Sequence, residues 1–160
     1  MNETSPITVK MAMAAWDNQI KRLSQLLEGF TDDQLMREVS PGRNRAIYLV
    51  GHLIAVHDAM NDILGLGKRA HSDLDEALIQ KPDKSGIAIP SATEMRKYWK
   101  DVHQNLRDAM QKLSPEEWFS RHNAMTDEDF QKDPSRNKLN VLLSRTGHAA
   151  YHSGQLHLLK

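Results

Sequence analysis

The sequence predicts an all-α protein, a four-helix bundle that forms one domain over residues 1–160. Leu, Ala and Met total 40 residues, whereas the β-branched Val, Ile and Thr total 20, and this composition favours helices over strands. Apolar residues also recur at alternating steps of three and four along four segments, which places them on one helix face. Burying four such stripes against one another gives a four-helix bundle.

The first two helices are predicted over residues 9–30 and 44–64. Between them, a capping box of Thr31 and Gln34 starts a short helical turn, and Gly65 is placed to cap the second helix at its end. The two buried stripes consist of Val9, Met13, Trp16, Ile20, Leu23, Leu27 and Phe30, and of Leu49, Leu53, Val56, Met60 and Ile63. We also expect Met11 in the core.

The second half of the chain predicts two further helices joined by long connections. Residues 66–90 are polar and form a long connection with one helical turn around Leu74 to Ile79; connections of this length often carry function. The third helix begins at a capping box, Ser91 with Glu94, and is followed by a short helix that bears Trp118. Residues 120–135 are predicted as a loop, and the fourth helix runs from Arg136 to the end.

Charge and composition exclude several classes of function. Lys plus Arg and Asp plus Glu both number 21, so no net field draws the chain to nucleic acid or to anionic lipid. The absence of cysteine excludes disulfides, thiolate metal sites and cysteine nucleophiles. The N-terminal stretch, residues 1–6, lacks the features of a secretory signal, and no run approaches the ~20 apolar residues that span a bilayer. We therefore expect a soluble, cytoplasmic protein with neither a nucleic-acid nor a membrane partner.

Three histidines stand out as candidate metal ligands. His148 and His152 are four residues apart on the fourth predicted helix, so both imidazoles can point at one ion. His52 lies in the most apolar stretch of the chain, about 40° from core-facing Val56. A histidine in such a place is either hydrogen-bonded in the core or bound to a ligand, and both interpretations stay open on these residues alone.

The other histidines carry no comparable pattern. The His-Glu-x-x-His pattern of zinc proteases and the Glu-x-x-His repeats of di-iron bundles are both absent. His57 lies about 140° around its helix from His52 and is expected at the bundle edge or in solvent. His71, His103 and His122 are expected at the surface.

The segment from His148 to Leu156 resembles the C-terminal signature of the DinB/YfiT-like superfamily, in which two histidines four apart are followed by x-Gly-Gln and an aliphatic residue. Residues 44–55, with one histidine late in an apolar helix, are similar to that family's other motif, and residues 31–42 resemble its approach to that helix. Tyr151 and Ser153 depart from the family's commonest form, where histidine and arginine are frequent. The resemblance covers nearly the whole chain.

The resemblance implies a divalent metal ion, zinc or nickel, held by His52, His148 and His152. Gln155, as a hydrogen-bond partner of a ligand histidine, and Tyr151 are candidates to line the surroundings of the ion. It implies a metal-dependent enzyme that acts on a small-molecule substrate, either a hydrolase or a transferase that uses a low-molecular-weight thiol. The alternative is a non-catalytic metal- or ligand-binding bundle that acts as a binding or stress-response protein. Relatives often pair, and Trp16 and Trp99 are candidates to extend beyond one core into a homodimer interface, although a chain of this length can bury about two-thirds of its surface unaided.

Overall fold

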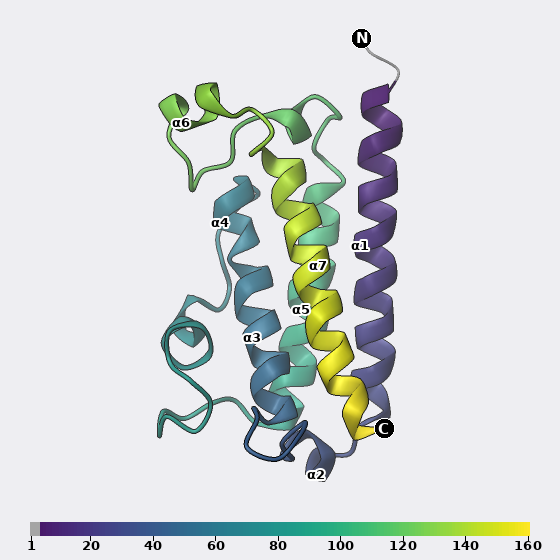
Figure 1. The fold of residues 1–160 in the computed structure, drawn as a ribbon, viewed down its shortest axis with the longest axis vertical. Helices are drawn as coiled ribbons and strands as arrows, with labels where there is room; N and C mark the ends of the chain where they lie inside the picture. Colours follow the sequence, from purple (N-terminus) through teal and green to yellow (C-terminus); the bar gives the residue numbers. More distant parts are fainter. Residues whose placement is uncertain (1–3) are drawn as a thin grey trace.

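The computed structural model describes residues 4–160, in which all regular secondary structure is helical and no strand is present (Figure 1). Part of the N-terminal stretch in which we expect no secretory signal, residues 1–3, lies outside the described residues. The α-helices are α1 (Thr4–Gly29), α2 (Asp32–Leu35), α3 (Ala46–Asp58), α4 (Met60–Leu64), α5 (Ala92–Met110), α6 (Asp127–Lys132) and α7 (Lys138–Leu156). Four shorter segments are η1 (Ser72–Leu74), η2 (Glu76–Gln80), η3 (Glu117–Phe119) and η4 (His157–Leu159).

The long helices α1, α3, α5 and α7 lie side by side (Figure 1). Helix α1 packs mainly on α7 and α3 packs mainly on α5. In the view of Figure 1, α1 and α7 run downward whereas α3 and α5 run upward, so the helices of each closely packed pair are parallel. Helices α3 and α5 follow each other among the long helices, and a parallel pair cannot be joined by a short turn, which accounts for the long connection that the sequence predicts before α5. The connection before α7 joins the antiparallel helices α5 and α7, so helix direction does not account for its length.

Local capping signals are confirmed at three places. Thr31 with Gln34 and Ser91 with Glu94 form reciprocal capping boxes at the starts of α2 and α5. Gly65 ends α4 in the left-handed conformation, at φ 69°. The second predicted helix is interrupted at Ala59, which separates α3 from α4.

The two long connections contain more helix than the sequence predicts. The segment 120–135, predicted as a loop, contains α6. In the segment 66–90, the predicted turn corresponds to η1 and to the π-helical η2. This segment is fixed to α3, because Tyr48 donates to the backbone carbonyl of Lys81 at 2.8 Å and Arg45 forms an ion pair with Asp83 at 2.7 Å. It therefore lies beside the helix that carries His52.

The core contains both large aromatic residues that the sequence offers for a homodimer interface, so the expectation that these two residues extend beyond one core is wrong, whereas the homodimer itself stays a prediction. Trp16 and Trp99 are 1% and 5% exposed within a single chain, because each packs between helices of its own bundle.

Met11 is also predicted incorrectly: it is 68% exposed, whereas its neighbour Ala12 is buried. One residue turns a helix by about 100°, so the side chain of Met11 points away from the stripe that contains Ala12.

Across residues 4–160, every helix is too short or too polar to serve as a membrane span.

Candidate metal centre

The structure brings together the three histidines that the sequence singles out. His52 comes from α3, and His148 and His152 come from successive turns of α7. One ring nitrogen from each lies within 4.8 Å of the others. His148 Nε2 is 3.3 Å from His52 Nε2 and 3.0 Å from His152 Nε2. The three Nε2 atoms therefore converge on one point between α3 and α7.

Hydrogen bonds at the far sides of two rings determine which nitrogen is free. His52 Nδ1 lies 2.7 Å from the carbonyl oxygen of Leu78, which can only accept, so His52 donates from Nδ1. His152 Nδ1 lies 2.7 Å from Gln155 Oε1 and donates in the same way. In the neutral rings, Nε2 of His52 and Nε2 of His152 then carry no proton, and each presents a lone pair.

His148 completes the set with a nitrogen that cannot satisfy both neighbours. Its Nε2 carries at most one proton, so it can donate to only one of the two lone pairs. A cation at the point of convergence would satisfy all three nitrogens, and three imidazoles with remaining open positions are a known donor set for Zn²⁺. The donor chemistry of these residues therefore fits a divalent metal ion.

Burial keeps the α7 histidines neutral, which is the form that binds metal. Burial is the main cause that lowers the pKa of His148 to about 4, and the neighbouring His152, His52 and Arg145 lower it further. Burial also lowers the pKa of His152, against an opposing effect of its hydrogen bond to Gln155. Both rings thus present lone pairs at neutral pH without prior loss of a proton.

Gln155 and Tyr151 lie next to His152. Besides accepting from His152, Gln155 donates from Nε2 to the Tyr151 hydroxyl at 3.5 Å. The Tyr151 ring is 65% exposed and its centroid lies 5.2 Å from that of His152. Ser153 is buried, and its backbone carbonyl accepts from His157 Nδ1 at 2.8 Å. Tyr151 therefore forms a solvent-facing wall beside the three histidines.

His57 and His103 were expected near the surface, and this expectation is wrong for both. His57 is fully buried and His103 is 8% exposed. His103 Nδ1 donates to the carbonyl of Trp99 at 2.7 Å, so His103 Nε2 accepts from His57 Nδ1 at 2.8 Å. Burial lowers the pKa of His57 and lowers that of His103 to about 4. The pair is a neutral, hydrogen-bonded element that joins α3 to α5.

A signal for the burial of His57 was present in the sequence. A helix that is apolar on all sides is buried on all sides, and nearly every residue of α3 is buried. The angle of 140° between His52 and His57 therefore does not separate a core face from a solvent face. His71 and His122 do lie in connections, where both are half-buried, and the ring of His71 packs on Tyr98 with centroids 4.1 Å apart.

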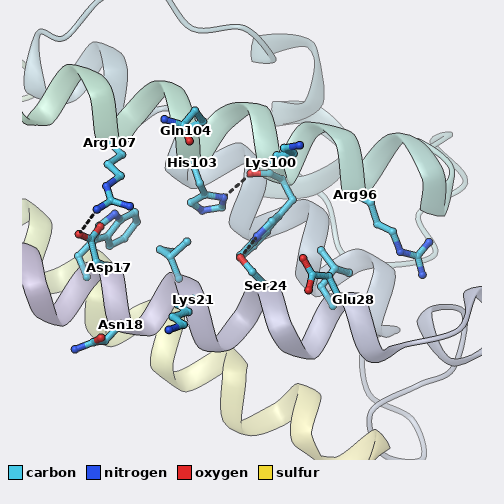
Figure 2. Close-up of a pocket in the computed structure, with 14 residues that line it drawn as sticks. Asp17, Asn18, Lys21, Ser24, Glu28, Arg96, Lys100, His103, Gln104 and Arg107 are labelled. Carbon is cyan, nitrogen blue, oxygen red and sulfur yellow. Dashed lines mark hydrogen bonds and ion pairs between the residues drawn. The ribbon is translucent and has the colours of Figure 1, made fainter.

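A separate groove of about 610 Å³ lies between α1 and α5 (Figure 2). Its lining includes Trp16, Trp99 and His103, and the Trp99 indole donates to Ser24 Oγ at 2.9 Å. Figure 2 shows charged side chains of both signs along its length, among them the ion pair of Arg107 and Asp17 at 3.5 Å. The three histidines of the candidate metal centre do not line this groove.

Comparison with models of protein families gives a match over most of the chain. The family model described as the DinB superfamily matches residues 15–156. This range contains the three converging histidines and Gln155. No curated protein matches the chain.

Proposed function

The chain belongs to the DinB superfamily, and from this premise we propose that it is a divalent-metal-dependent enzyme built on a four-helix bundle. His52, His148 and His152 would hold the ion through their Nε2 atoms. The observation that carries the proposal is the convergence of three ring nitrogens. Two of them, in His52 and His152, present lone pairs because the other nitrogen of each ring donates a hydrogen bond. Zinc and nickel suit an all-imidazole donor set.

The chain's own residues would orient the ligands and keep them neutral. The carbonyl of Leu78 and the amide oxygen of Gln155 fix the tautomers of His52 and His152, as partners of metal-bound histidines commonly do. Because imidazoles are uncharged, the ligands leave the positive charge of the ion intact. When bound, the ion would supply Lewis acidity, which makes water or a thiol a nucleophile near neutral pH.

The reaction we propose is attack of water or of a low-molecular-weight thiol on a small electrophile. His148 is half-buried and His152 is buried, and the exposed ring of Tyr151 lies next to His152. A small substrate could therefore approach past the Tyr151 ring. Whether water or a thiol is the nucleophile decides between a hydrolase and an S-transferase.

Metal analysis tests the ligand set. We expect about one Zn²⁺ or Ni²⁺ per chain in the wild type after loading and dialysis. His148→Ala should lose this ion, whereas His157→Gln, which removes an exposed histidine just beyond α7, should retain it. Equal metal content in all three proteins would refute the site.

Turnover is tested on the wild type and on His152→Ala. Thiol-dependent loss of a chloro-nitroarene would support the S-transferase, and cleavage in a panel of esters and amides would support the hydrolase; either activity should disappear in His152→Ala. Metal loading that raises the melting temperature without turnover in any panel would instead indicate a non-catalytic metal-binding bundle.

A further inference from the structure

A half-buried arginine without a counter-charge lies on the same helix as two of the three histidines. Arg145 precedes His148 by three residues and His152 by seven, so all three share the inward face of α7. Within residues 4–160, Arg145 has no ion pair or hydrogen bond, and its Nε is buried without a partner. A desolvated cation in this state has lost water without gaining a partner.

Other half-buried arginines of the structure are paired with carboxylates. They are Arg45 with Asp83 at 2.7 Å, Arg69 with Asp75 at 2.5 Å, Arg96 with Asp32 at 2.6 Å and Arg121 with Asp127 at 2.6 Å. Arg145 is therefore an exception within its own protein. Its partner has to come from outside residues 4–160, or its charge remains uncompensated.

Two further buried nitrogens near Arg145 also have no partner, and they are His148 Nδ1 and His57 Nε2. Burial is the main reason that the pKa values of these two histidines are lowered, and the charge of Arg145 adds to both shifts. When His148 uses Nε2 as a ligand, its Nδ1 carries a proton and becomes a second donor without an acceptor. His52 and His152 have such acceptors, in Leu78 and Gln155.

We propose that Arg145 and His148 Nδ1 bind an anionic oxygen group of the substrate, a carboxylate or a phosphate, one helical turn from the point where the three histidines converge. Arg145 would donate to this group from its guanidinium, and His148 from Nδ1. The proposal rests on the proposed function only in that the anion belongs to a substrate of the three-histidine site. It names the substrate class as small anionic electrophiles.

A buried water is the competing explanation for the unpartnered nitrogens. One water can accept from Arg145 and from His148 Nδ1 and donate to His57 Nε2. Such a water would satisfy the nitrogens without any affinity for anions, so anion binding separates the two explanations.

The test uses metal-free protein, so that an anion cannot bind through a metal ion. In this state the proton of His148 can sit on Nε2, which faces two acceptor nitrogens, so the variants at Arg145 carry the test. Inorganic phosphate and acetate are titrated at constant ionic strength, with calorimetry and the melting temperature as readouts. In the wild type, phosphate or acetate at ten times its Kd should raise the melting temperature by about 3 to 6 °C. Arg145→Gln should bind the same anion at least about tenfold more weakly, and Arg145→Lys should retain part of the affinity.

The matched control is Arg22→Gln, which removes an exposed arginine of α1 and should bind the anion as the wild type does. Without anion, Arg145→Gln should melt no lower than the wild type, because it removes an uncompensated cation. A structural role for Arg145 predicts the opposite, a lower melting temperature with no dependence on anion. Equal response of all four proteins to both anions, or no response, overturns the proposal.

Nickel binding by the same variants separates this inference from the proposed function. Arg145→Gln should still bind Ni²⁺, because it keeps all three ligands. Selective anion binding in a protein that binds no metal would refute the enzyme proposal and leave the anion site. Metal binding with no anion response that depends on Arg145 would refute the anion site alone.

Discussion

His52 and Leu78 are joined by a hydrogen bond of 2.7 Å between the imidazole Nδ1 and a backbone carbonyl oxygen. Leu78 belongs to η2, in the middle of the long connection between α4 and α5. This connection therefore takes part in the candidate metal centre, since it sets the tautomer of one ligand. Leu78 is itself fully buried and packs where Gly51 of α3 has no side chain.

Gly51→Ala should destabilise the protein and disturb this hydrogen bond. A Cβ at position 51 would lie 2.6 Å from Met95 Cε and 2.9 Å from Leu78 Cδ1. Both contacts are shorter than real Cβ atoms tolerate, and both involve ends of flexible side chains, so we expect the overpacking to cost about 1 to 3 kcal/mol. This cost outweighs the gain of about 0.5 to 1 kcal/mol that alanine brings in a helix. Urea unfolding measures this change.

Gly147→Ala is the matched control, because Gly147 also lies inside a long helix and no atom lies within 4 Å of its added Cβ. Replacing an unhindered helical glycine by alanine should stabilise the protein by about 0.5 to 1 kcal/mol. If the two variants change stability in the same direction and by the same amount, the packing of Leu78 on Gly51 does not constrain the connection.

Gln155→Leu should weaken metal binding without loss of a ligand. The substitution removes the oxygen that accepts from His152 Nδ1 at 2.7 Å, and loss of such a partner typically costs about 10- to 100-fold in metal affinity. Competition with a chromogenic chelator measures the affinity for Zn²⁺. Gln155→Glu keeps an acceptor oxygen and should bind Zn²⁺ at least as tightly as the wild type, whereas equal weakening by both variants would contradict the role of the oxygen.

Asp58→Ala should be strongly destabilising because Asp58 organises the chain after α4. Its carboxylate is buried and accepts from the backbone amides of Ala70 and His71 at 3.0 and 2.9 Å and from Arg69 at 3.3 Å. Removing one partner of a buried ion pair costs about 3 to 5 kcal/mol. Asp62→Ala, which removes an exposed aspartate of α4, should change the free energy of unfolding by less than about 0.5 kcal/mol.

The helices and the three candidate ligands could be predicted because both depend on local periodicity. A spacing of four residues places His148 and His152 on one helix face whatever the rest of the fold does, and His52 was found because a histidine is rare in so apolar a stretch. The tautomer of His52 could not be predicted, because its partner is a backbone carbonyl in a π-helical turn and any residue there supplies a carbonyl.

Errors arose where one apolar face was assumed for each helix. Helix α3 is buried on nearly all sides, so the angular position of His57 did not indicate its exposure. His103 is buried and is paired with His57 from another helix, a contact that the periodicity of neither helix indicates. Arg145 was missed because an arginine on an inward face is recognised as unusual only when its lack of a carboxylate partner is visible.

The buried pair of His57 and His103 should make the stability of the metal-free protein depend on pH. Histidine ordinarily titrates near 6.5, whereas burial lowers the pKa of His103 to about 4 and lowers that of His57 as well. Below pH 6.5, His57 and His103 bind protons in the unfolded chain but remain neutral in the folded chain until the pH is lower. The stability that the neutral pair contributes is therefore fully present above pH 6.5 and is lost as the pH falls toward 4.

His103→Gln should reduce this dependence, because it removes one suppressed titration, while those of His57, His148 and His152 remain. An amide oxygen can still accept from His57 Nδ1. The lowering of the His103 pKa from 6.5 to about 4 corresponds to about 3 kcal/mol, so the fall in the free energy of unfolding between pH 6.5 and 4 should shrink by about that amount. Urea unfolding at a series of pH values measures the fall. His157→Gln removes an exposed histidine and should keep the wild-type profile, and an unchanged profile in His103→Gln would mean that the buried pair is not the source of the acid sensitivity.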